Sequence, residues 1–376
     1  MDRPVHLNSV TIRGFRGFDS LDIDRVGRVN LIVGRNCVGK SSFLEAMRIH
    51  ATRAHPAVLI DILEGRQEVS TRSSEPLVGS EEKEGPSGVN YLFHGYPPQA
   101  GHIRPIQIGS CGLRSNVLEI GVRWYREEQD SEGLRKLVEV PSDQWGSAPD
   151  TLPALSIRHG DFRRVVALDE STRSIQKRRY WRGEPSDMAC IYISRCGTDS
   201  LNPVGRLWDR VALTEREGHV TEGLRILAPE IERISLVGEE TFRSSRIVVA
   251  KIVGQKRPLP LQNLGDGASR IFEIVISLVN AMGGILLVDE IENGLHYSVQ
   301  TGLWKMIMRL AKALDVQVYA TSHSWDCVEA FQKISLEETG EQGVLIRLTR
   351  HDNRLVATTF DESQLAVATR EQIEVR

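Results

Sequence analysis

The chain has 376 residues, of which 40% are hydrophobic and 26% charged, the composition of a folded protein long enough for two or three domains. Its 47 Lys and Arg against 50 Asp and Glu give a net charge of −3, which argues against nucleic-acid binding through bulk positive charge. The five cysteines form no Cys-x-x-Cys pair, which favours reduced thiols over a zinc site. No apolar stretch has the length of a signal peptide or a membrane span, so we expect a cytoplasmic protein without membrane contacts.

The N-terminal part predicts the opening of an α/β nucleotide-binding unit. Alternating apolar residues predict strands over 7–13 and 21–26, and a buried strand over 29–34 precedes a glycine-rich loop and a helix. This succession is typical of nucleotide-binding folds. Residues 64–90 are polar and predict an exposed insertion.

Short alternating runs between about 105 and 170 predict antiparallel strands. The apolar spacing is then helical from about 205 to 236, and a strand is expected over 246–253. From 271 onwards, apolar helices alternate with continuous apolar strands that end at Glu290 and His323. Such strands indicate a parallel sheet covered on both faces, and two further strands close the chain.

Residues 34–41 match the phosphate-loop pattern G-x-x-x-x-G-K-S, between the buried strand and the helix. Backbone N–H groups of such a loop surround phosphate oxygens, and the helix N-terminus adds positive potential. Lys40 would reach the β- and γ-phosphates, and the Ser41 hydroxyl would bind Mg²⁺. A chance glycine-rich turn is the alternative. The predicted nucleotide-binding residues are Gly34, Arg35, Asn36, Cys37, Val38, Gly39, Lys40, Ser41 and Ser42.

Two acidic residues end the apolar strand 285–288. One carboxylate at such a position lies near Mg²⁺ and the next near the attacking water, so we assign Asp289 to the metal and Glu290 to the general base. A solvated acidic turn after a strand is the alternative.

His323 ends the next apolar strand, 34 residues after Asp289, a separation that fits one helix and one strand. A histidine there can hydrogen-bond the γ-phosphate or the attacking water, although a lone strand-end histidine is more often structural. The loop of Gly265, Asp266 and Gly267 opens an apolar helix and forms a second candidate anion site; a capping turn is the simpler interpretation.

These four elements, in this order and spacing, resemble the ABC-type ATPases of the SMC/RecF/OLD branch. The segments IRGFRGF and VNLIVGRNCVGKSSFLEA resemble the N-terminus and phosphate loop of that branch. The segments that begin LGDGASRIFEIV and VQVYATSH are similar to the C-terminal half of the bacterial AAA15/AAA21 ATPases, many of which serve in antiphage defence. The resemblance implies an α/β ABC-type ATPase head, a P-loop NTPase with a mixed or parallel sheet, an inserted β-rich region and a helical lid lobe. The expected division is 1–63 (first part of the head), 64–90 (insertion), 91–200 (β-rich, basic middle), 201–257 (lid lobe and returning strand) and 258–376 (second part of the head).

The resemblance further implies that the head binds ATP and Mg²⁺ and dimerises around ATP, as a homodimer or a larger assembly. The signature loop at Gly265 would act on the partner's ATP, although glycine stands where the family has serine. The D-loop would be Asn293, Gly294, Leu295 and His296. The glutamine that usually completes Mg²⁺ coordination has only Gln107 as a candidate.

Related OLD nucleases carry a C-terminal TOPRIM domain, for which the roughly fifty residues after His323 are too few. We therefore expect ATPase activity and no nuclease activity of the chain's own. Residues 156–186 hold eight Lys or Arg against four acids, a local charge of +4. They form a candidate patch for nucleic acid or a partner, with a solvated loop as the equal alternative. Its residues are Arg173, Lys177, Arg178, Arg179, Trp181 and Arg182.

Two functions remain open at this point. The first is an ATP-hydrolysing sensor or scaffold in antiphage defence that controls a separately encoded effector, such as a nuclease or toxin. The second is a RecF-like repair or recombination clamp that binds DNA when ATP is bound. A membrane-transporter cassette is disfavoured, because the chain has no LSGGQ-like signature.

Overall fold

The computed structural model describes residues 7–68, 88–95, 104–112, 116–129, 135–141, 151–168, 175, 188–198, 203–226, 228–238, 246–337, 343–352, 354–360 and 364. The candidate basic patch lies outside the described residues, as does most of the predicted polar insertion. Within the part described, no helix combines the length and apolarity needed to cross a membrane.

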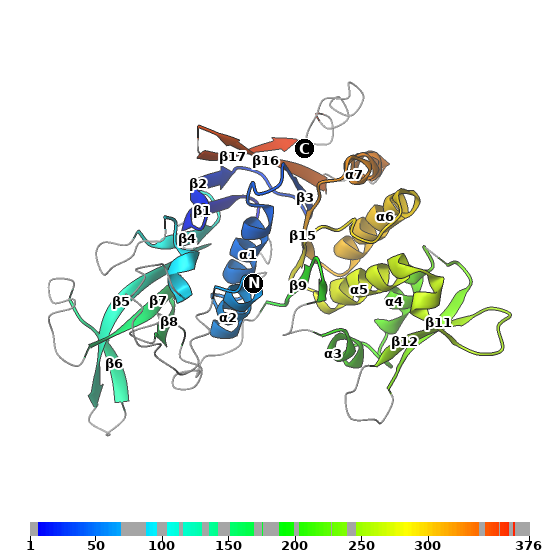
Figure 1. Cartoon of the computed structure of the whole chain (residues 1–376), viewed down its shortest axis with the longest axis horizontal. Coiled ribbons are helices and arrows are strands. Elements are labelled where there is room, and N and C mark those ends of the chain that lie inside the picture. Colours follow the sequence, from blue (N-terminus) through cyan, green and yellow to red (C-terminus); the bar gives the residue numbers. More distant parts are fainter. Residues whose placement is uncertain are drawn as a thin grey trace, which may run out of the picture.

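A seven-stranded mixed sheet forms the centre of the molecule, in the order β10-β9-β14-β15-β3-β16-β17 (Figure 1). Its inner strands pair in parallel, and only the two edge pairs are antiparallel. The strands are β3 (Val29–Val33), β9 (Cys190–Ser194), β10 (Gly197–Thr198), β14 (Ile285–Val288), β15 (Gln317–Thr321), β16 (Gly343–His351) and β17 (Arg354–Phe360). The predicted parallel sheet and its two closing strands are confirmed.

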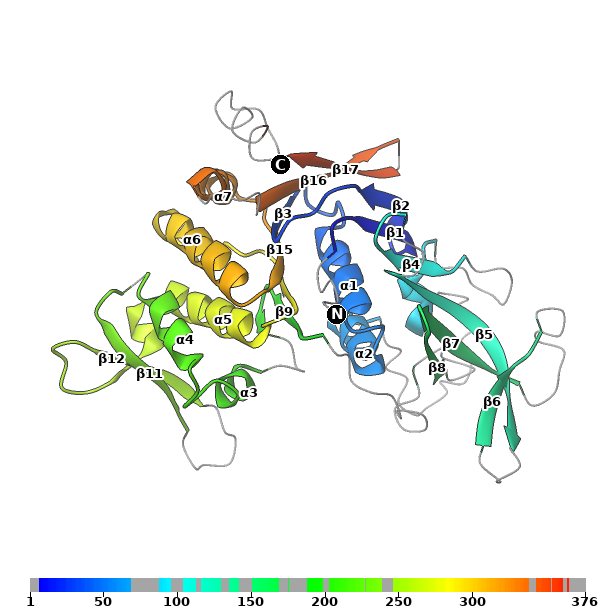
Figure 2. The same cartoon turned by 180° about the vertical axis from the view of Figure 1, so that it is seen from behind.

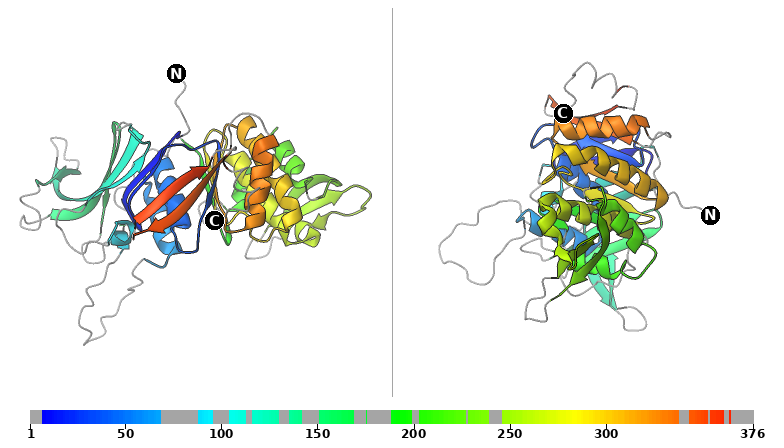
Figure 3. Two further views of the ribbon diagram at one scale, coloured as in Figure 1. Left: turned by 90° about the horizontal axis from the view of Figure 1, so that it is seen from above. Right: turned by 90° about the vertical axis from the view of Figure 1, so that its right-hand side faces the viewer.

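The inner strands of this sheet are buried on both faces, and every residue of β3, β14 and β15 is buried. Val29, Leu31 and Val33 of β3 join one hydrophobic core, while Ile32 joins the other. The first core includes helices α5 (Asp266–Asn280), α6 (Tyr297–Ala313) and α7 (Trp325–Glu337). The second includes α1 (Lys40–Ala51) and α2 (Pro56–Gly65). The sheet thus holds α1 on one side and α5 to α7 on the other (Figure 3).

A second, antiparallel sheet packs beyond α1, with the order β2-β1-β4-β5-β7-β8 and β6 paired to β5 (Figure 2). Its strands are β1 (Val10–Phe15), β2 (Phe18–Ile23), β4 (Ile106–Gly109), β5 (Val117–Gln129), β6 (Arg135–Glu139), β7 (Thr151–His159) and β8 (Phe162–Ala167), with a 3-10 turn at Gly88–Leu92. The antiparallel strands predicted from 105 to 170 are confirmed, and β7 is an addition.

The lid lobe differs from the sequence prediction. It contains two helices, α3 (Val204–Asp209) and α4 (Glu217–Leu224), but Ile231–Val237 is a strand, β11. This strand forms a small sheet in the order β11-β12-β13, with β12 at Ile247–Ile252 and β13 at Leu259–Pro260. A 3-10 turn, Leu261–Leu264, follows. The prediction of helix up to 236 was wrong for a specific reason. A register irregularity after Ile231 shifts the alternation, so Ile231 and Ile234 are both buried although they are three residues apart, which is a helical spacing.

The expected middle region, 91–200, also divides differently. Strands β4 to β8 join β1 and β2 in the antiparallel sheet, whereas β9 and β10 join the central sheet beside β14. Strand β9 is short, and its fully buried side chains are Ile191 and Ile193, too few to mark a core strand by pattern alone.

Gln317 ties the start of the described chain to the central sheet. Its side-chain amide donates to Leu7 O at 2.8 Å and Gly27 O at 2.9 Å, and its oxygen accepts from Leu7 N at 3.1 Å. Replacing it with methionine keeps the volume but leaves buried backbone groups unpaired. We expect Gln317→Met to lower the free energy of unfolding by roughly 2–4 kcal/mol, measured by urea denaturation.

Gln300→Met is the matched control. Gln300 is also buried, but its side-chain oxygen has no hydrogen-bond partner among the described residues, so the expected loss is under about 1.5 kcal/mol. Equal losses in the two variants would contradict the assigned role of Gln317.

Candidate functional site

Four parallel strands, β9, β14, β15 and β3, end at one edge of the central sheet, and the candidate residues follow these ends. Backbone hydrogen bonds hold the ends in line: Asp289 N donates to Ile193 O at 2.8 Å, and Ser322 N donates to Ile32 O at 3.0 Å. The carboxyl edge of such a sheet is where α/β proteins bind ligands.

The loop after β3 has a backbone that requires its glycines. Gly34 and Gly39 have φ of 147° and 103°, and Cys37 also has a positive φ, 61°. A Cβ on Gly34 would lie 2.5 Å from Leu348 O, so no larger residue fits. Arg35, Asn36 and Cys37 are exposed, and the loop ends where α1 begins, at Lys40.

The Lys40 ammonium lies inside this loop. It donates to Gly34 O at 2.6 Å and to Arg35 O at 3.1 Å. Burial lowers the pKa of Lys40, and the carboxylates of Asp289 and Glu290 oppose that effect. The side chain is therefore a partly desolvated cation that a phosphate would stabilise.

Asp289 is the centre of the site. Its Oδ2 accepts from Ser41 Oγ at 2.9 Å, and its Oδ1 accepts from Thr321 Oγ1 at 2.6 Å. The same Thr321 oxygen accepts from Glu290 N at 2.8 Å. The structure thus brings Ser41 and Asp289, 248 residues apart, into direct contact. Thr321 was not predicted, because threonine at a strand end carries no distinctive signal.

Ser41 and Asp289 fit a magnesium site. Two ligands at neighbouring corners of an octahedron with bonds of about 2.1 Å lie about 3 Å apart, close to their 2.9 Å oxygen separation. Within the described ranges, no group of three or more His, Cys, Asp or Glu side chains is arranged to hold a metal ion. A cation here would take its remaining ligands from water and phosphate, the usual arrangement for Mg²⁺.

Glu290 follows at once with a left-handed backbone, φ 49°. Its side chain is 28% exposed, and its Oε1 lies 3.9 Å from Nη1 of Arg195, which follows β9. Arg195 was not predicted to belong to the site.

His323 lies beside Glu292, an acid that the sequence analysis did not name. Its N–H donates to Glu292 Oε1 at 3.0 Å, and its Nδ1 lies 3.3 Å from the same oxygen. The imidazole is 54% exposed at this edge, so it remains accessible to a ligand. Glu292 is the acid that orients it, which the sequence analysis missed.

Arg270, on α5, forms hydrogen bonds with the backbone at the ends of two of these strands, β9 and β14. Its guanidinium donates to Ser194 O at 3.2 Å, Asp289 O at 3.0 Å and Glu290 O at 3.2 Å, and it pairs with Glu273 at 3.1 Å. An arginine inside an apolar helix is the sequence signal that could have identified it.

The signature-like loop and the D-loop lie against one another. A Cβ on Gly267 would lie 3.4 Å from both Gly294 O and Leu295 Cδ2. Asn293 Nδ2 donates to Arg195 O at 3.0 Å, and His296 caps the N-terminus of α6. Gly265 has φ 100°, which favours glycine over the serine expected there.

Among the described residues, Gln107 forms no hydrogen bond with Ser41 or Asp289. It lies in β4, paired with Arg13 of β1, and its amide donates to Glu119 Oε2 at 3.4 Å. Strand β4 belongs to the antiparallel sheet, and its position in the sequence does not indicate which of the two sheets it joins.

A buried ionic network supports the first turns of α1. Arg16 pairs with Glu45 and Glu68, each at 2.7 Å, and Arg66 pairs with Glu45 at 2.7 Å and donates to Ser42 Oγ at 3.1 Å. Burial raises the pKa of Glu45, while Arg16 and Arg66 oppose this. The network fixes the helix turn that carries Ser41 and Ser42.

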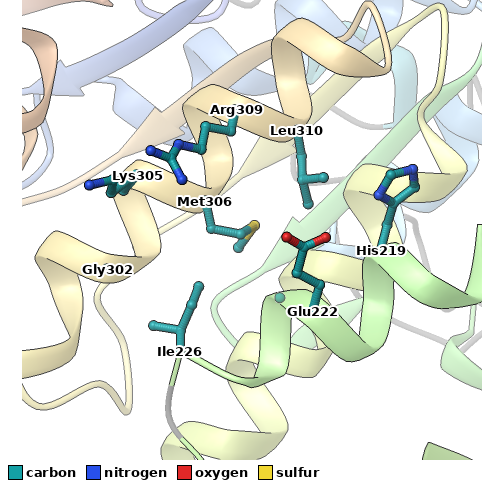
Figure 4. Close-up of a pocket in the computed structure, with 9 residues that line it drawn as sticks. His219, Glu222, Ile226, Gly302, Lys305, Met306, Arg309 and Leu310 are labelled. Carbon is teal, nitrogen blue, oxygen red and sulfur yellow. The ribbon is translucent and has the colours of Figure 1, made fainter. Parts of the chain in front are cut away.

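A cavity of about 390 Å³ lies between α4 and α6, apart from this site (Figure 4). Its lining combines apolar side chains, such as Ile226 and Met306, with the charged side chains of Glu222 and Lys305. The two helices approach closely beside it, since a Cβ on Gly302 would lie 2.7 Å from Ile226 Cγ2. None of its lining residues was predicted as a site residue.

Comparison with known proteins agrees with this fold. Residues 213–328 match the family model of the AAA ATPase domain. The chain is 24% identical over 368 residues to a Helicobacter pylori protein named ATP/GTP phosphatase, covering 94% of this chain and 95% of that one. A solved SMC head bound to the C-winged helix domain of ScpA matches 98% of this chain and 100% of that chain, with a TM-score of 0.50 and 12% identity. The SMC head domain from Thermotoga maritima matches 94% of this chain and 99% of that chain, with a TM-score of 0.43 and 12% identity.

The predicted fold class is therefore confirmed: the chain has the mixed α/β fold of an SMC-type P-loop ATPase head.

Arg270 provides a test of the site's construction that needs no ligand. Removing the buried guanidinium leaves three backbone carbonyls and the Glu273 carboxylate without their hydrogen-bond donor. We therefore expect Arg270→Met to lower the free energy of unfolding by roughly 3–5 kcal/mol, measured by urea denaturation. Hydrogen exchange of the Glu290 and Ile291 amides should also accelerate. Arg233→Met is the control, because Arg233 is 66% exposed and its pair with Glu217 should contribute under about 1 kcal/mol. Unchanged exchange at Glu290 in Arg270→Met would contradict this role.

Proposed function

We propose that the chain binds ATP with Mg²⁺ and hydrolyses it in a head that pairs with a second copy of itself. The observation that carries the proposal is the contact of Ser41 with Asp289 at 2.9 Å, which joins the phosphate loop to the acidic strand end. The AAA ATPase match over 213–328 and the relative named ATP/GTP phosphatase support it. Because that name includes GTP, both nucleotides belong in the assays.

In this proposal the loop amides of residues 34–41 surround the β- and γ-phosphates. Lys40 exchanges the carbonyls of Gly34 and Arg35 for phosphate oxygens. Ser41 and Asp289 would hold Mg²⁺, which would supply charge neutralisation at the phosphates. Thr321 fixes the rotamer of Asp289 through its 2.6 Å hydrogen bond.

Glu290 orients the attacking water and accepts its proton. The water oxygen bonds to the γ-phosphorus, and the bond from that phosphorus to the bridging oxygen breaks, so ADP leaves with the electron pair. His323, oriented by Glu292, approaches the γ-phosphate as a hydrogen-bond partner. Its exposure leaves it free to do so.

A second copy of the chain would complete the site with its signature-like loop, Gly265 to Gly267, through backbone N–H groups. The D-loop contact with Gly267 and with Arg195 O supports this, because it connects the two surfaces that would meet across the dimer. ATP would close the dimer and hydrolysis would open it, with the lid lobe transmitting the change.

We further propose that this cycle controls a separately encoded effector in bacterial antiphage defence, such as a nuclease or toxin. The SMC head that matches this chain is itself described bound to another protein's domain, ScpA, so such heads do bind partners. The chain itself would cut no nucleic acid. Co-purification with the product of the adjacent gene tests the proposal, and a chain that stays solitary with and without ATP would contradict it.

Two substitutions separate binding from hydrolysis. Lys40→Ala should abolish ATP binding in calorimetry, because it removes the cation of the loop. Glu290→Gln should bind ATP but hydrolyse it roughly 100-fold more slowly, and should accumulate as a dimer in light scattering. Equal ATPase rates in Glu290→Gln and wild type would show that Glu290 is not the base. Absence of ATP binding by the wild type would refute the proposed function.

The lowered pKa of Lys40 predicts a pH dependence. A depressed pKa means that the amine becomes neutral at a lower pH than a free lysine, and a neutral amine does not pair with phosphate. ATP affinity should therefore fall as the pH rises through the alkaline range, and binding within that range should be accompanied by proton uptake. Calorimetry in buffers of different ionisation enthalpy measures both. Lys40→Arg should remove the dependence, because guanidinium stays charged.

A further inference from the structure

Arg195 follows strand β9 of the central sheet and lies beside Glu290, but the proposed mechanism gives it no role. Strand β9 is the parallel neighbour of β14, and Ile193 is level with Val288. Continuing that register by two residues places Ser194 beside Asp289 and Arg195 beside Glu290. The sheet register therefore places the cationic side chain of Arg195 next to the proposed general base, Glu290.

Hydrogen bonds from three different elements fix the backbone around Ser194 and Arg195. Arg270 donates to Ser194 O, Asn293 donates to Arg195 O, and Ser194 Oγ donates to Gly197 O at 2.9 Å and accepts from Cys196 N at 3.1 Å. Three elements, α5, the D-loop and the β9–β10 turn, therefore fix the Cα of Arg195.

Its side chain is held far less firmly. The guanidinium is 65% exposed, and the 3.9 Å separation from Glu290 Oε1 is longer than a hydrogen bond. Exposed ion pairs of this kind contribute little to stability. A rigid backbone with an exchangeable cation is the arrangement expected of a ligand-binding arginine.

The charges around it favour a phosphate. Asp289, Glu290 and Glu292 gather at this edge, and Lys40 is the cation inside the loop. A triphosphate adds several negative charges that Mg²⁺ and one lysine only partly neutralise. Arginine has no acceptor atom and cannot bind Mg²⁺, but its forked N–H groups match phosphate oxygens.

We propose that Arg195 binds the γ-phosphate in cis, leaving Glu290 when ATP enters. The proposal rests on the proposed function. Arg195 exchanges the Glu290 carboxylate for a γ-phosphate oxygen and stabilises the charge that develops there. Glu290 then loses its cationic neighbour and becomes available to the attacking water.

The test compares Arg195→Ala, Arg195→Gln and Arg195→Lys with wild type. We expect roughly 100-fold lower kcat in the Ala and Gln variants, because both lack the charge, with Lys in between. Calorimetry in the Glu290→Gln background should show about tenfold weaker binding of a β,γ-imido ATP analogue. ADP binding should stay within about twofold, because ADP lacks the γ-phosphate. Arg216→Ala, an exposed arginine at the N-cap of α4, is the matched control and should leave both readouts unchanged.

Three results would overturn the assignment. The first is a wild-type kcat in Arg195→Ala. The second is full activity in Arg195→Gln, which would indicate that the amide binds the metal. The third is an equal loss of ADP binding and analogue binding, which would indicate a general disturbance of the loop. Each requires an active wild type. A wild type that neither binds nor hydrolyses ATP would instead refute the proposed function, and this assignment with it.

Discussion

The Asp289 carboxylate is the interaction on which the arrangement of the site depends. Its two oxygens accept from Ser41 on α1 and from Thr321 on β15, and Thr321 in turn accepts from the amide of Glu290. One buried side chain thereby fixes the relative positions of the phosphate loop, the acidic strand end and the neighbouring strand. The carboxylate is hydrogen-bonded on both oxygens, which satisfies the requirement for burying a charge.

This contact is possible because the central sheet is packed on both faces. Strands β3, β14 and β15 are mostly apolar and buried at every residue, so they are stable only when both faces of the sheet are covered. Their parallel register brings their carboxyl ends to one edge, where polar groups are solvated or paired. The site is therefore a direct consequence of the topology.

Arg270 links this edge to the lid lobe. It lies in the second turn of α5, whose first turn carries the signature-like loop, and it contacts the backbone of both β9 and β14. A displacement of α5 would move the carbonyls of Asp289 and Glu290 with it. The same helix packs against α3 and α4, so the lobe and the acidic strand end share one rigid element.

The sequence by itself determined the phosphate loop, the acidic strand end and the parallel sheet, because glycines with required positive φ and continuous apolar strands leave few alternatives. It did not determine β11, where a register irregularity imitates helical spacing, or β9, whose two buried residues carry too little pattern. Gln107 was chosen by residue type, and the structure placed it in the other sheet. Thr321, Glu292, Arg270 and Arg195 are ordinary residues in the sequence. Only the tertiary structure gives them a place in the site, because hydrogen bonds between strands 30 to 100 residues apart depend on sheet order, which local pattern does not encode.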